Sequence, residues 1–439
     1  MRRDETIFAL ASGAGRAGVA LVRVSGRDAR ICLSSLTGTP LPPPRRAVLR
    51  TLRGPDGAAI DRALVLWFAA PDSFTGEDTA EFHVHGGRAI LEALTDALAA
   101  IPGVRLAEPG EFTRRAVLNG KLDLTQAEAI ADLVEAETEA QRLQALRQYD
   151  GALAALYDGW RLALSKALAW AEAAIDFSDE ELPQEVIAEA RRMTDTIREE
   201  VEAHLRDGRR GELVRDGLFV AIVGPPNAGK SSLLNALAGR DVAIVSETAG
   251  TTRDIIEVRL NLGGYAVVVA DTAGLREAGD AIEAEGVRRA LARAGSADLV
   301  LLLRDGSTES NSLNIQDKLD NKAVLNLWNK ADLPWPDRRE GLALSLKSGE
   351  GLEAVVAAIA VVARERLEAS SETPVLTRAR HREALEDAIF ALERALDAEA
   401  LELYAEDLRL AVRAIGRITG RVDVEDLLDV IFRDFCIGK

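Results

Sequence analysis

The chain has 439 residues and a formal net charge of −17 at pH 7, with 47% hydrophobic and 28% charged residues. This length predicts about two to four domains with separate cores, and the negative charge argues against general affinity for nucleic acid while leaving room for a local basic patch. The two cysteines, Cys32 and Cys436, are too few for a disulfide framework.

The start of the chain carries charge but no long apolar segment, so it does not resemble a secretory signal. No later run approaches the roughly 18 apolar residues that a membrane-spanning helix needs. We therefore expect a cytoplasmic protein without a membrane partner.

The first part of the chain, residues 1–118, mixes short β-type runs with one helical pattern. Apolar runs at 19–24, 63–68 and 80–84 predict strands, and the stretch 89–100 predicts a helix. Glycine and proline interrupt the pattern often. This mixture is typical of an α+β domain.

A helical pattern occupies the middle of the chain and returns near its end. Residues 119–213 are rich in alanine, leucine and glutamate, and leucines recur at helical spacing at positions 143, 146, 153 and 156. Residues 376–439 have the same character, whereas 214–375 do not. We expect a fold of class α/β and α, in which a helical domain is split by an inserted domain with a mixed, mostly parallel sheet and flanking helices. The polar stretch 304–322 predicts a loop between strands.

The inserted segment begins with a phosphate-binding loop in its required context. Residues 224–231 read Gly-Pro-Pro-Asn-Ala-Gly-Lys-Ser, directly after the apolar run 218–223 and before the apolar-periodic stretch 233–238. A strand that feeds a helix through such a turn lets backbone N–H groups and the helix dipole face phosphate oxygens. We expect Lys230 to reach the outer phosphates and Ser231 to bind magnesium.

Three further elements follow in order, each at the end of a strand-like run. The run 267–270 ends in Asp-Thr-Ala-Gly, where Asp271 can hold magnesium through water. The run 323–328 ends in Asn-Lys-Ala-Asp, where Asp332 can accept two hydrogen bonds from guanine, whereas adenine has no matching pair of donors. Ser-Leu-Lys at 345–347 provides a backbone contact to the guanine O6. Together the four elements resemble the translation-factor class of GTPases.

One position in these elements departs from many small GTPases. They place a glutamine directly after the Asp-x-x-Gly motif to orient water, and here that position is Leu275. Arg253 and Arg276 lie nearby, but arginines in such loops are ordinarily solvated. Another group must therefore supply positive charge at the bridge between the β- and γ-phosphates.

Several blocks of sequence resemble the MnmE (TrmE) family of tRNA modification GTPases. Besides the four elements, the matching blocks are 18–26, 72–78, 119–129, 246–254 and 435–439, so the resemblance runs from residue 6 to the last residue. The tail Phe-Cys-Ile-Gly-Lys and the block Asp-Ser-Phe-Thr-Gly-Glu-Asp are its most specific parts, because many GTPases share the rest.

That resemblance implies a GTPase that works with a separate FAD-dependent protein, MnmG. Together the two add an aminomethyl-type or carboxymethylaminomethyl group to C5 of the wobble uridine of certain tRNAs. A derivative of tetrahydrofolate, 5,10-methylene- or 5-formyl-tetrahydrofolate, supplies the one-carbon unit. The N-terminal domain binds this folate and makes a homodimer. Closure of the loop 246–254 would then move helices at the chain crossings near 214 and 375.

The resemblance also completes the expected nucleotide site. The GTP contacts are Asn227, Ala228, Gly229, Lys230, Ser231, Ser232, Ser246, Glu247, Thr248, Ala249, Gly250, Thr251, Thr252, Asp271, Thr272, Ala273, Gly274, Asn329, Lys330, Asp332, Ser345, Leu346 and Lys347. Mg²⁺ is expected on Ser231 and Thr252. In the family K⁺ supplies the missing charge, and its ligands here are Asn227, Ser246, Thr248 and Thr251. Oxygen ligands suit such a hard cation, although Asn227 by itself also suits a plain turn.

The attacking water needs an orienting group, and the sequence provides three candidate glutamates. Glu277, Glu283 and Glu285 compete on the residues alone, and an exposed helical glutamate is the default interpretation of each. The family pattern selects Glu283 as the catalytic residue, because 271–283 contains no insertion relative to it.

Folate is expected, by resemblance, at Arg23, Glu81, Lys121 and Lys439. A carboxylate matches the edge of a pterin ring and cations attract the carboxylate tail, although Arg23 or Lys121 alone would be an ordinary solvated charge. In the family the cysteine that matches Cys436 matters for tRNA modification and not for GTP hydrolysis.

Three other chemically distinctive residues carry no assigned role. Cys32 is interpreted as structural. His83 and His85 share one face of a strand, but no third ligand is near in sequence, so a metal site is not expected.

A function of a different class stays open. The same GTPase motifs would suit a ribosome-assembly or regulatory switch without modification chemistry. The folate-type blocks of the N-terminal part and the tail with Cys436 favour tRNA modification.

Overall fold

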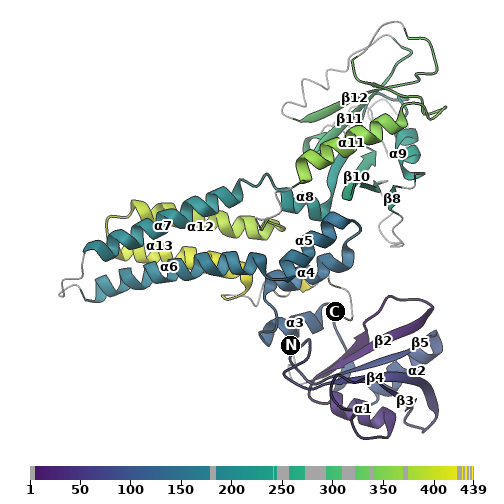
Figure 1. Ribbon diagram of the computed structural model, residues 1–439, viewed down its shortest axis with the longest axis vertical. Helices are drawn as coiled ribbons and strands as arrows, with labels where there is room; N and C mark the ends of the chain where they lie inside the picture. Colours follow the sequence, from purple (N-terminus) through teal and green to yellow (C-terminus); the bar gives the residue numbers. More distant parts are fainter. Residues whose placement is uncertain are drawn as a thin grey trace, which may run out of the picture. The chain divides into compact units, whose positions relative to one another are not determined.

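The computed structural model describes residues 5–177, 184–240, 242–244, 257–271, 293–308, 322–335, 340–368 and 374–422, together with Leu428, Ile431, Phe432, Phe435 and Gly438. The chain forms two compact units (Figure 1). One contains Met1–Ala131, Tyr149–Ala169 and Ala405–Lys439, and the other contains Asp132–Gln148 and Trp170–Tyr404. The predicted domain boundaries at 118, 213 and 375 stay a prediction.

The N-terminal part is built on a six-stranded sheet with the order β3-β4-β5-β2-β1-β6. Its strands are β1 (Thr6–Leu10), β2 (Ala17–Ser25), β3 (Val48–Arg53), β4 (Ala59–Phe68), β5 (Thr79–Gly86) and β6 (Val104–Leu106). Neighbours are antiparallel except β1 and β6, which are parallel. The helices α1 (Ala29–Thr37) and α2 (Arg88–Ala99) pack on the same apolar face.

Alternation of core and non-core residues explains why helices cover one face of this sheet. In β2, Ala20, Val22 and Val24 enter the core with α1 and α2, while Leu21 and Arg23 between them face the other side. The predicted strands at 19–24, 63–68 and 80–84 and the helix at 89–100 are confirmed to within four residues at each end. Cys32 is fully buried in this core, and burial raises the pKa of its thiol to about 12, which fits the structural role expected for it.

Helices precede and follow the second sheet, as the split pattern predicted. Before it come α3 (Glu111–Leu118), α4 (Leu124–Glu135), α5 (Glu139–Tyr149), α6 (Ala152–Asp176), α7 (Gln184–Leu205) and α8 (Arg210–Asp216), and after it come α12 (Ala379–Asp397) and α13 (Leu401–Thr419). Segments distant in sequence are joined here: α7 packs on α12, and the Tyr404 hydroxyl of α13 lies 2.8 Å from the Thr194 hydroxyl of α7. None of the helices in the described part of the chain is both long and apolar enough to cross a membrane.

The second sheet has seven strands in the order β13-β12-β11-β7-β10-β9-β8. They are β7 (Leu218–Val223), β8 (Ala243–Ile244), β9 (Glu257–Leu262), β10 (Tyr265–Asp271), β11 (Leu299–Asp305), β12 (Ala323–Asn329) and β13 (Leu342–Ala343). The strands from β13 to β10 are parallel, whereas β9 is antiparallel to both β10 and β8. This is the mixed, mostly parallel sheet that was predicted.

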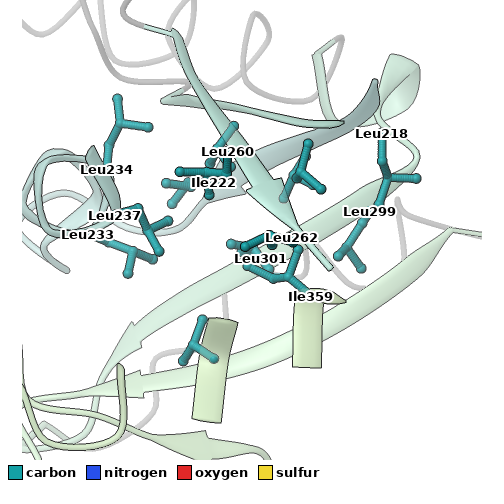
Figure 2. Packing of buried hydrophobic residues seen from close by; sticks show 14 of the residues in the cluster. Leu218, Ile222, Leu233, Leu234, Leu237, Leu260, Leu262, Leu299, Leu301 and Ile359 are labelled. Carbon is teal, nitrogen blue, oxygen red and sulfur yellow. The ribbon is translucent and has the colours of Figure 1, made fainter. Parts of the chain in front are cut away.

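One face of this sheet carries the main core of the inserted domain. Figure 2 shows Ile222 and Leu301 of the sheet, Leu233 and Leu237 of α9 (Lys230–Ala238), and Ile359 of α11 (Leu352–Leu367) gathered in one apolar cluster. A smaller cluster with Ala221, Val300 and Leu302 covers the opposite face. Strands buried on both faces read as continuous apolar runs, which is why they were recognisable in the sequence.

The parallel strands β7, β10, β11 and β12 end at the same edge of the sheet. Loops that follow them therefore meet there, as in open α/β sheets generally. The prediction of a loop at 304–322 is wrong at its start, because Arg304 and Asp305 pair with β12 as the last residues of β11; residues 309–321 lie outside the described residues.

Candidate functional site

The loop between β7 and α9 needs both of its outer glycines. A Cβ on Gly224 would lie 2.1 Å from the carbonyl oxygen of Leu303, and Gly229 has a φ of +102° with Asn329 Nδ2 only 2.6 Å from the position of a Cβ. Such contacts and such a backbone angle exclude any other residue. Asn227, with a φ of +62°, adopts a left-handed conformation that asparagine tolerates. The loop is thus fixed by its neighbours in the shape that directs N–H groups outward.

Lys230 folds back over this loop. Its Nζ donates to the carbonyl oxygens of Gly224 at 3.0 Å and Pro225 at 2.9 Å. Burial lowers the pKa of the ammonium group, and the nearby carboxylate of Asp271 opposes this effect. The amine lies at the start of α9, where a phosphate would also meet the positive end of the helix dipole.

Ser231 and Asp271 bring two oxygen ligands together from different elements. The Ser231 hydroxyl of α9 donates to Asp271 Oδ2 at the end of β10, at 2.6 Å. Asp271 is buried, so its charge is poorly screened by water. A hydroxyl beside a carboxylate is a donor set that Mg²⁺ prefers, and the residues fit this ion.

Asn329, the last residue of β12, joins three segments of the site. Its Nδ2 donates to the carbonyl oxygen of Ala228 at 2.9 Å, and its Oδ1 accepts from the backbone N–H groups of Lys330 at 2.7 Å and Leu346 at 3.2 Å. The side chain is buried, so the three bonds are shielded from water. One amide therefore links the phosphate loop to both segments predicted to contact the base.

The two segments predicted to contact the base are also held to each other. Asp332 Oδ1 accepts a hydrogen bond from the Ser345 hydroxyl at 2.7 Å, and this bond is the main cause that lowers the pKa of Asp332. The backbone N–H of Ala331 donates to Leu344 O at 3.0 Å. Asp332 is thus held as a carboxylate acceptor, as recognition of guanine requires, while Lys347 is exposed.

Two residues that the sequence did not suggest complete this edge. Asp305 at the end of β11 pairs with Lys330, whose Nζ lies 2.5 Å from Asp305 Oδ2. Burial raises the pKa of Asp305, but its bonds to Lys330 and Ser307 outweigh this and lower it overall. Trp335 Nε1 donates to Lys330 O, and its ring lies so close that a Cβ on Gly306 would be 2.4 Å from it. An acid two residues after the apolar run 299–303 was the available signal.

Many predicted site residues lie outside the described residues. They are Ser246, Glu247, Thr248, Ala249, Gly250, Thr251, Thr252, Thr272, Ala273, Gly274, Glu283, Cys436 and Lys439. Among those that are described, the structure brings Asn227, Ala228, Gly229, Lys230, Ser231 and Ser232 to one turn, with Asp271, Asn329, Lys330, Asp332, Ser345 and Leu346 at the same edge of the sheet.

In the N-terminal part, two predicted folate residues are partners. Arg23 of β2 and Glu81 of β5 lie opposite each other in the sheet, and Arg23 Nη2 is 2.8 Å from Glu81 Oε1. The rings of Phe74 and Phe112 lie 5.5 Å and 5.9 Å from the guanidinium carbon of Arg23. Lys121 is held separately, with its Nζ 3.0 Å from the carbonyl oxygen of Pro71.

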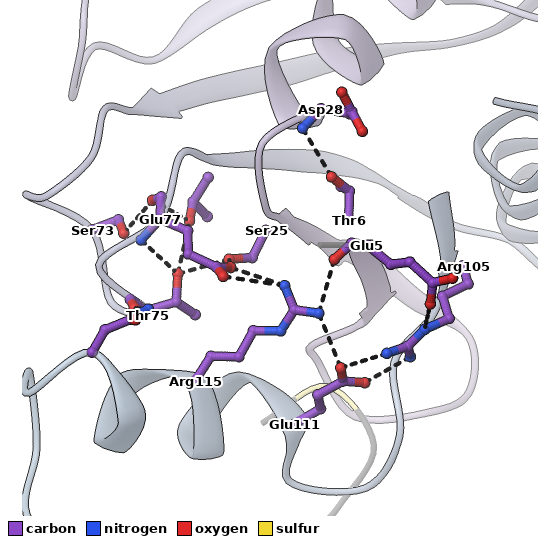
Figure 3. Close-up of polar contacts among 12 residues, drawn as sticks. Glu5, Thr6, Ser25, Asp28, Ser73, Thr75, Glu77, Arg105, Glu111 and Arg115 are labelled. Atoms are coloured by element: carbon purple, nitrogen blue, oxygen red, sulfur yellow. Dashed lines mark hydrogen bonds and ion pairs between the residues drawn. The ribbon is translucent and has the colours of Figure 1, made fainter. Parts of the chain in front are cut away.

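A buried ion-pair network fixes the loop that carries Phe74 (Figure 3). Arg115 of α3 contacts Glu77 at 3.1 Å and Glu111 at 3.0 Å, and Glu111 also pairs with Arg105 at 2.7 Å. Burial raises the pKa of Glu111, but its bonds to Arg105, the Glu108 N–H and Arg115 outweigh burial and lower it overall. Glu77 accepts a further bond from Ser25 at 2.8 Å. The network ties α3 and the loop to the sheet.

The two histidines of β5 have separate carboxylate neighbours. His85 Nδ1 lies 2.9 Å from Asp61 Oδ1, and His83 Nε2 lies 3.6 Å from Glu81 Oε2. Burial raises the pKa of Asp61, but the bonds from the backbone and ring of His85 lower it overall. Within the described ranges no cluster of three or more potential metal ligands is present.

Comparison with known proteins decides the family. Residues 6–121 match the family model described as the N-terminus of the GTP-binding protein TrmE, and residues 124–436 match the MnmE helical domain. A protein of Parvibaculum lavamentivorans named tRNA modification GTPase MnmE is 57% identical over 99% of this chain and 100% of its own length. The chain belongs to the MnmE family. A protein of the same name from Paramagnetospirillum magneticum is 56% identical over 99% of this chain and 100% of its own length.

A solved structure is similar to a smaller part of this chain. Aquifex aeolicus Era bound to GDP.AlF4- is 27% identical over 39% of this chain and 66% of that chain, with a TM-score of 0.27. Because this score is low, the family assignment rests on the curated relatives. Family membership confirms the resemblance seen in the sequence, the prediction of a GTPase, and an architecture of an N-terminal α+β domain, a helical domain and an inserted P-loop GTPase domain.

Proposed function

We propose that this member of the MnmE family hydrolyses GTP at the edge of the second sheet and couples that reaction to modification of the wobble uridine of certain tRNAs. The observation that carries the nucleotide site is the buried amide of Asn329, which joins the phosphate loop to the segments of Lys330 and Leu346. A side chain in that position organises phosphate and base contacts together. In this proposal Asp332 recognises guanine by accepting hydrogen bonds from it, and Lys347 lies beside the base.

Mg²⁺ would be held by Ser231 and Thr252, with Asp271 acting through water, and when bound it would neutralise charge that develops on the phosphates. The 2.6 Å approach of the Ser231 hydroxyl to Asp271 supports this site. Lys230 contributes a second positive charge from the loop itself. Its ammonium group exchanges its two carbonyl acceptors for phosphate oxygens, which are stronger acceptors because they are charged.

K⁺ is the proposed source of charge at the bridge between the β- and γ-phosphates. Asn227 would bind it through the side-chain oxygen, with Ser246, Thr248 and Thr251 as the remaining ligands. Asn227 is exposed at the turn with a φ of +62°, and no described residue hydrogen-bonds to its side chain, so the amide oxygen is available to a cation. Glu283 would orient the attacking water.

The N-terminal part is proposed to bind a tetrahydrofolate derivative, with Arg23, Glu81, Lys121 and Lys439 as contacts. The Arg23–Glu81 pair beside the rings of Phe74 and Phe112 supports this, because aromatic faces and a charged pair together suit a flat heterocycle with a polar edge. The buried network around Arg115 holds the loop of Phe74 in place and so preorganises the contact.

The proposed partners are tRNA, a second copy of the chain, and the FAD-dependent protein MnmG. With MnmG the chain would add an aminomethyl or carboxymethylaminomethyl group to C5 of the wobble uridine, and Cys436 would serve this step and not GTP hydrolysis. The matching relatives, named tRNA modification GTPase MnmE over essentially their full length, support this assignment.

A reconstituted reaction tests the proposal. The chain, MnmG, GTP, FAD, a methylene-tetrahydrofolate source and unmodified tRNA are incubated, and the wobble nucleoside is measured by mass. Cys436→Ser should abolish modification and leave GTP hydrolysis intact, whereas Glu283→Ala should slow hydrolysis by about 10²-fold or more, the range of a lost general base. A wild-type chain that hydrolyses GTP but never modifies tRNA would favour the alternative, a ribosome-assembly or regulatory switch.

A further inference from the structure

Arginines recur on the hairpin formed by β3 and β4 in the N-terminal part and in the residues just before it. Residues 45–62 contain five arginines and two aspartates, which gives this segment a charge of +3 in a chain of net charge −17. We call Arg46, Arg50, Arg53 and Arg62 the hairpin arginines. Arg46, Arg53 and Arg62 are exposed, and Arg50 is half-buried.

The hairpin arginines lack carboxylate partners. No described residue forms an ion pair with any of the four, and their side chains make only two hydrogen bonds within the described ranges, from Arg50 to Leu49 O and from Arg53 to Gly57 O. Elsewhere most exposed arginines are paired, as Arg88 is with Glu92. Unpaired guanidinium groups on one hairpin leave a local positive field that the rest of the chain does not cancel.

The two aspartates of the hairpin are already engaged by other groups. Asp61 accepts from both the backbone N–H and the ring of His85, and Asp56 Oδ1 accepts from the backbone N–H of Ala58 at 2.9 Å. Asp61 also accepts from the backbone N–H of Arg62 at 2.7 Å, and within the described residues neither carboxylate forms an ion pair with a hairpin arginine. An arrangement that satisfies the acids elsewhere and leaves the arginines free is suited to an anionic partner.

The spacing of the arginines fits a phosphate backbone. Arg62 lies opposite Thr51, and the register of β3 and β4 shifts between Leu52 and Arg53, so Arg53 and Arg62 lie on adjacent strands near the turn of the hairpin. Long arginine side chains on adjacent strands reach successive phosphates of one nucleic-acid strand. Guanidinium groups are the preferred cations for phosphate because each donates two parallel hydrogen bonds.

We propose that the exposed hairpin arginines, Arg46, Arg53 and Arg62, bind the sugar-phosphate backbone of tRNA. This inference rests on the proposed function in tRNA modification and names the surface of the chain that it leaves open. Contacts of this kind position an RNA without reading its sequence. The surface belongs to the same compact unit as the proposed folate site, so it would bring the RNA to the part of the chain where the one-carbon unit is held.

A double variant with a matched control tests the surface. Arg53→Ala with Arg62→Ala removes two of the hairpin arginines, and Arg364→Ala with Arg366→Ala removes two exposed arginines from the last turn of α11, which also lack ion pairs with described residues. Both variants change the charge of the full chain equally. Binding of an unmodified tRNA transcript is measured between about 50 and 200 mM salt, because each phosphate contact lowers the slope of log K against log salt by about 0.9.

We expect the slope for the hairpin variant to become less negative by about 1.8, and its affinity for tRNA at about 0.1 M salt to fall by up to 60-fold. The tRNA binding of the control variant, and GTP hydrolysis by both variants, should stay unchanged. Equal loss in both variants, or no loss in either, overturns the inference. A changed oligomeric state of the hairpin variant on size-exclusion chromatography, with tRNA affinity retained, would show that the arginines guard an edge strand. If the wild-type chain binds no tRNA, the inference fails, whereas the proposed function is judged separately by the mass of the wobble nucleoside in the reconstituted reaction.

Discussion

Replacement of Asn329 by alanine is the sharpest test of the nucleotide site. The variant removes the amide that donates to Ala228 O and accepts from the N–H groups of Lys330 and Leu346. A typical hydrogen bond contributes about 1 kcal/mol net, and a buried group that loses its partner costs about 1–3 kcal/mol. The bond to Lys330 N–H is local, whereas the other two hold separate segments in place.

Those two long-range bonds set the expected effect on nucleotide affinity. At about 1 kcal/mol each they correspond to about 2 kcal/mol, or a loss of roughly 30-fold in GTP affinity. Asn329→Asp separates the two contributions, because a carboxylate still accepts from the N–H groups of Lys330 and Leu346 but opposes the carbonyl oxygen of Ala228. That variant should lose at least about fivefold, the value of the single bond to the phosphate loop.

The assay is equilibrium titration with a fluorescent GTP analogue, on protein whose thermal transition shows that it is folded. The matched control is Asn326→Ala, which changes an asparagine of the same strand whose side chain, among the described residues, accepts only from Arg304, at 3.3 Å. The control should bind GTP like the wild type. If Asn329→Ala binds GTP within about threefold of the wild type, its amide does not organise the site and the reasoning fails.

Other predictions concern the base, the cation and pH. Asp332→Asn should weaken GTP binding and admit xanthosine triphosphate in a competition assay, because the amide donates where the carboxylate accepted; unchanged GTP affinity would contradict the guanine assignment. GTP turnover should be faster in potassium than in sodium chloride at equal ionic strength, and Asn227→Ala should remove that difference with GTP binding retained; equal wild-type rates would refute the cation site. Glu111→Gln should destabilise the N-terminal part by about 1–3 kcal/mol at pH 7, because Arg105 and Arg115 lose a charged hydrogen-bond acceptor but keep Glu5 and Glu77. Since the pKa of Glu111 is lowered from 4.5 in the folded chain, its contribution is complete above that pH and is lost as the pH falls through the folded value. Denaturation curves of both proteins should therefore converge in acid, and a constant difference would contradict the ion-pair explanation.

The sequence predicted the nucleotide edge well because each element there is local. The run 218–223 is β7 to the residue, and the helix expected near Lys230 begins at Lys230. Apolar runs of this length, bounded by glycine or by a polar motif, identify buried parallel strands without knowledge of their neighbours. The order of the four motifs then places them at one edge, because parallel strands end on the same side of the sheet.

Contacts that depend on strand order escaped prediction for a physical reason. Asp305 meets Lys330 because β11 and β12 are neighbours and Asp305 lies opposite Asn329 in their register. Nothing in the sequence fixes which parallel strands are adjacent. The network around Arg115 could not be predicted for the same reason, because its partner Glu77 lies in a loop 38 residues away in the sequence. An arginine in a helix is expected to be exposed to solvent until its neighbours are known.

Bonds at the chain crossings give the proposed coupling between GTP and the helices a physical basis. α5 contacts the second sheet through Ala140, whose N–H donates to Gly264 O in the turn between β9 and β10 at 3.1 Å. It also contacts α8, the entry to the inserted domain, because Gln141 Nε2 donates to Arg215 O and Gln144 Nε2 to Gly211 O, both at 2.8 Å.

The return crossing is held just as closely. A Cβ on Gly211 would lie 2.1 Å from Leu376 O, and Arg215 Nη1 donates to Thr377 O at 2.9 Å. Since β9 follows closely on the loop predicted to close over GTP, a displaced β9 must either break the bond between Ala140 and Gly264 or carry α5 with it. That bond is worth about 1 kcal/mol, and the two glutamine bonds that join α5 to α8 are worth about 2 kcal/mol together, within the roughly 1–3 kcal/mol typical of coupling between sites. Because α5 is bonded to both the β9–β10 turn and α8, this arrangement favours transmission of loop closure into the helices.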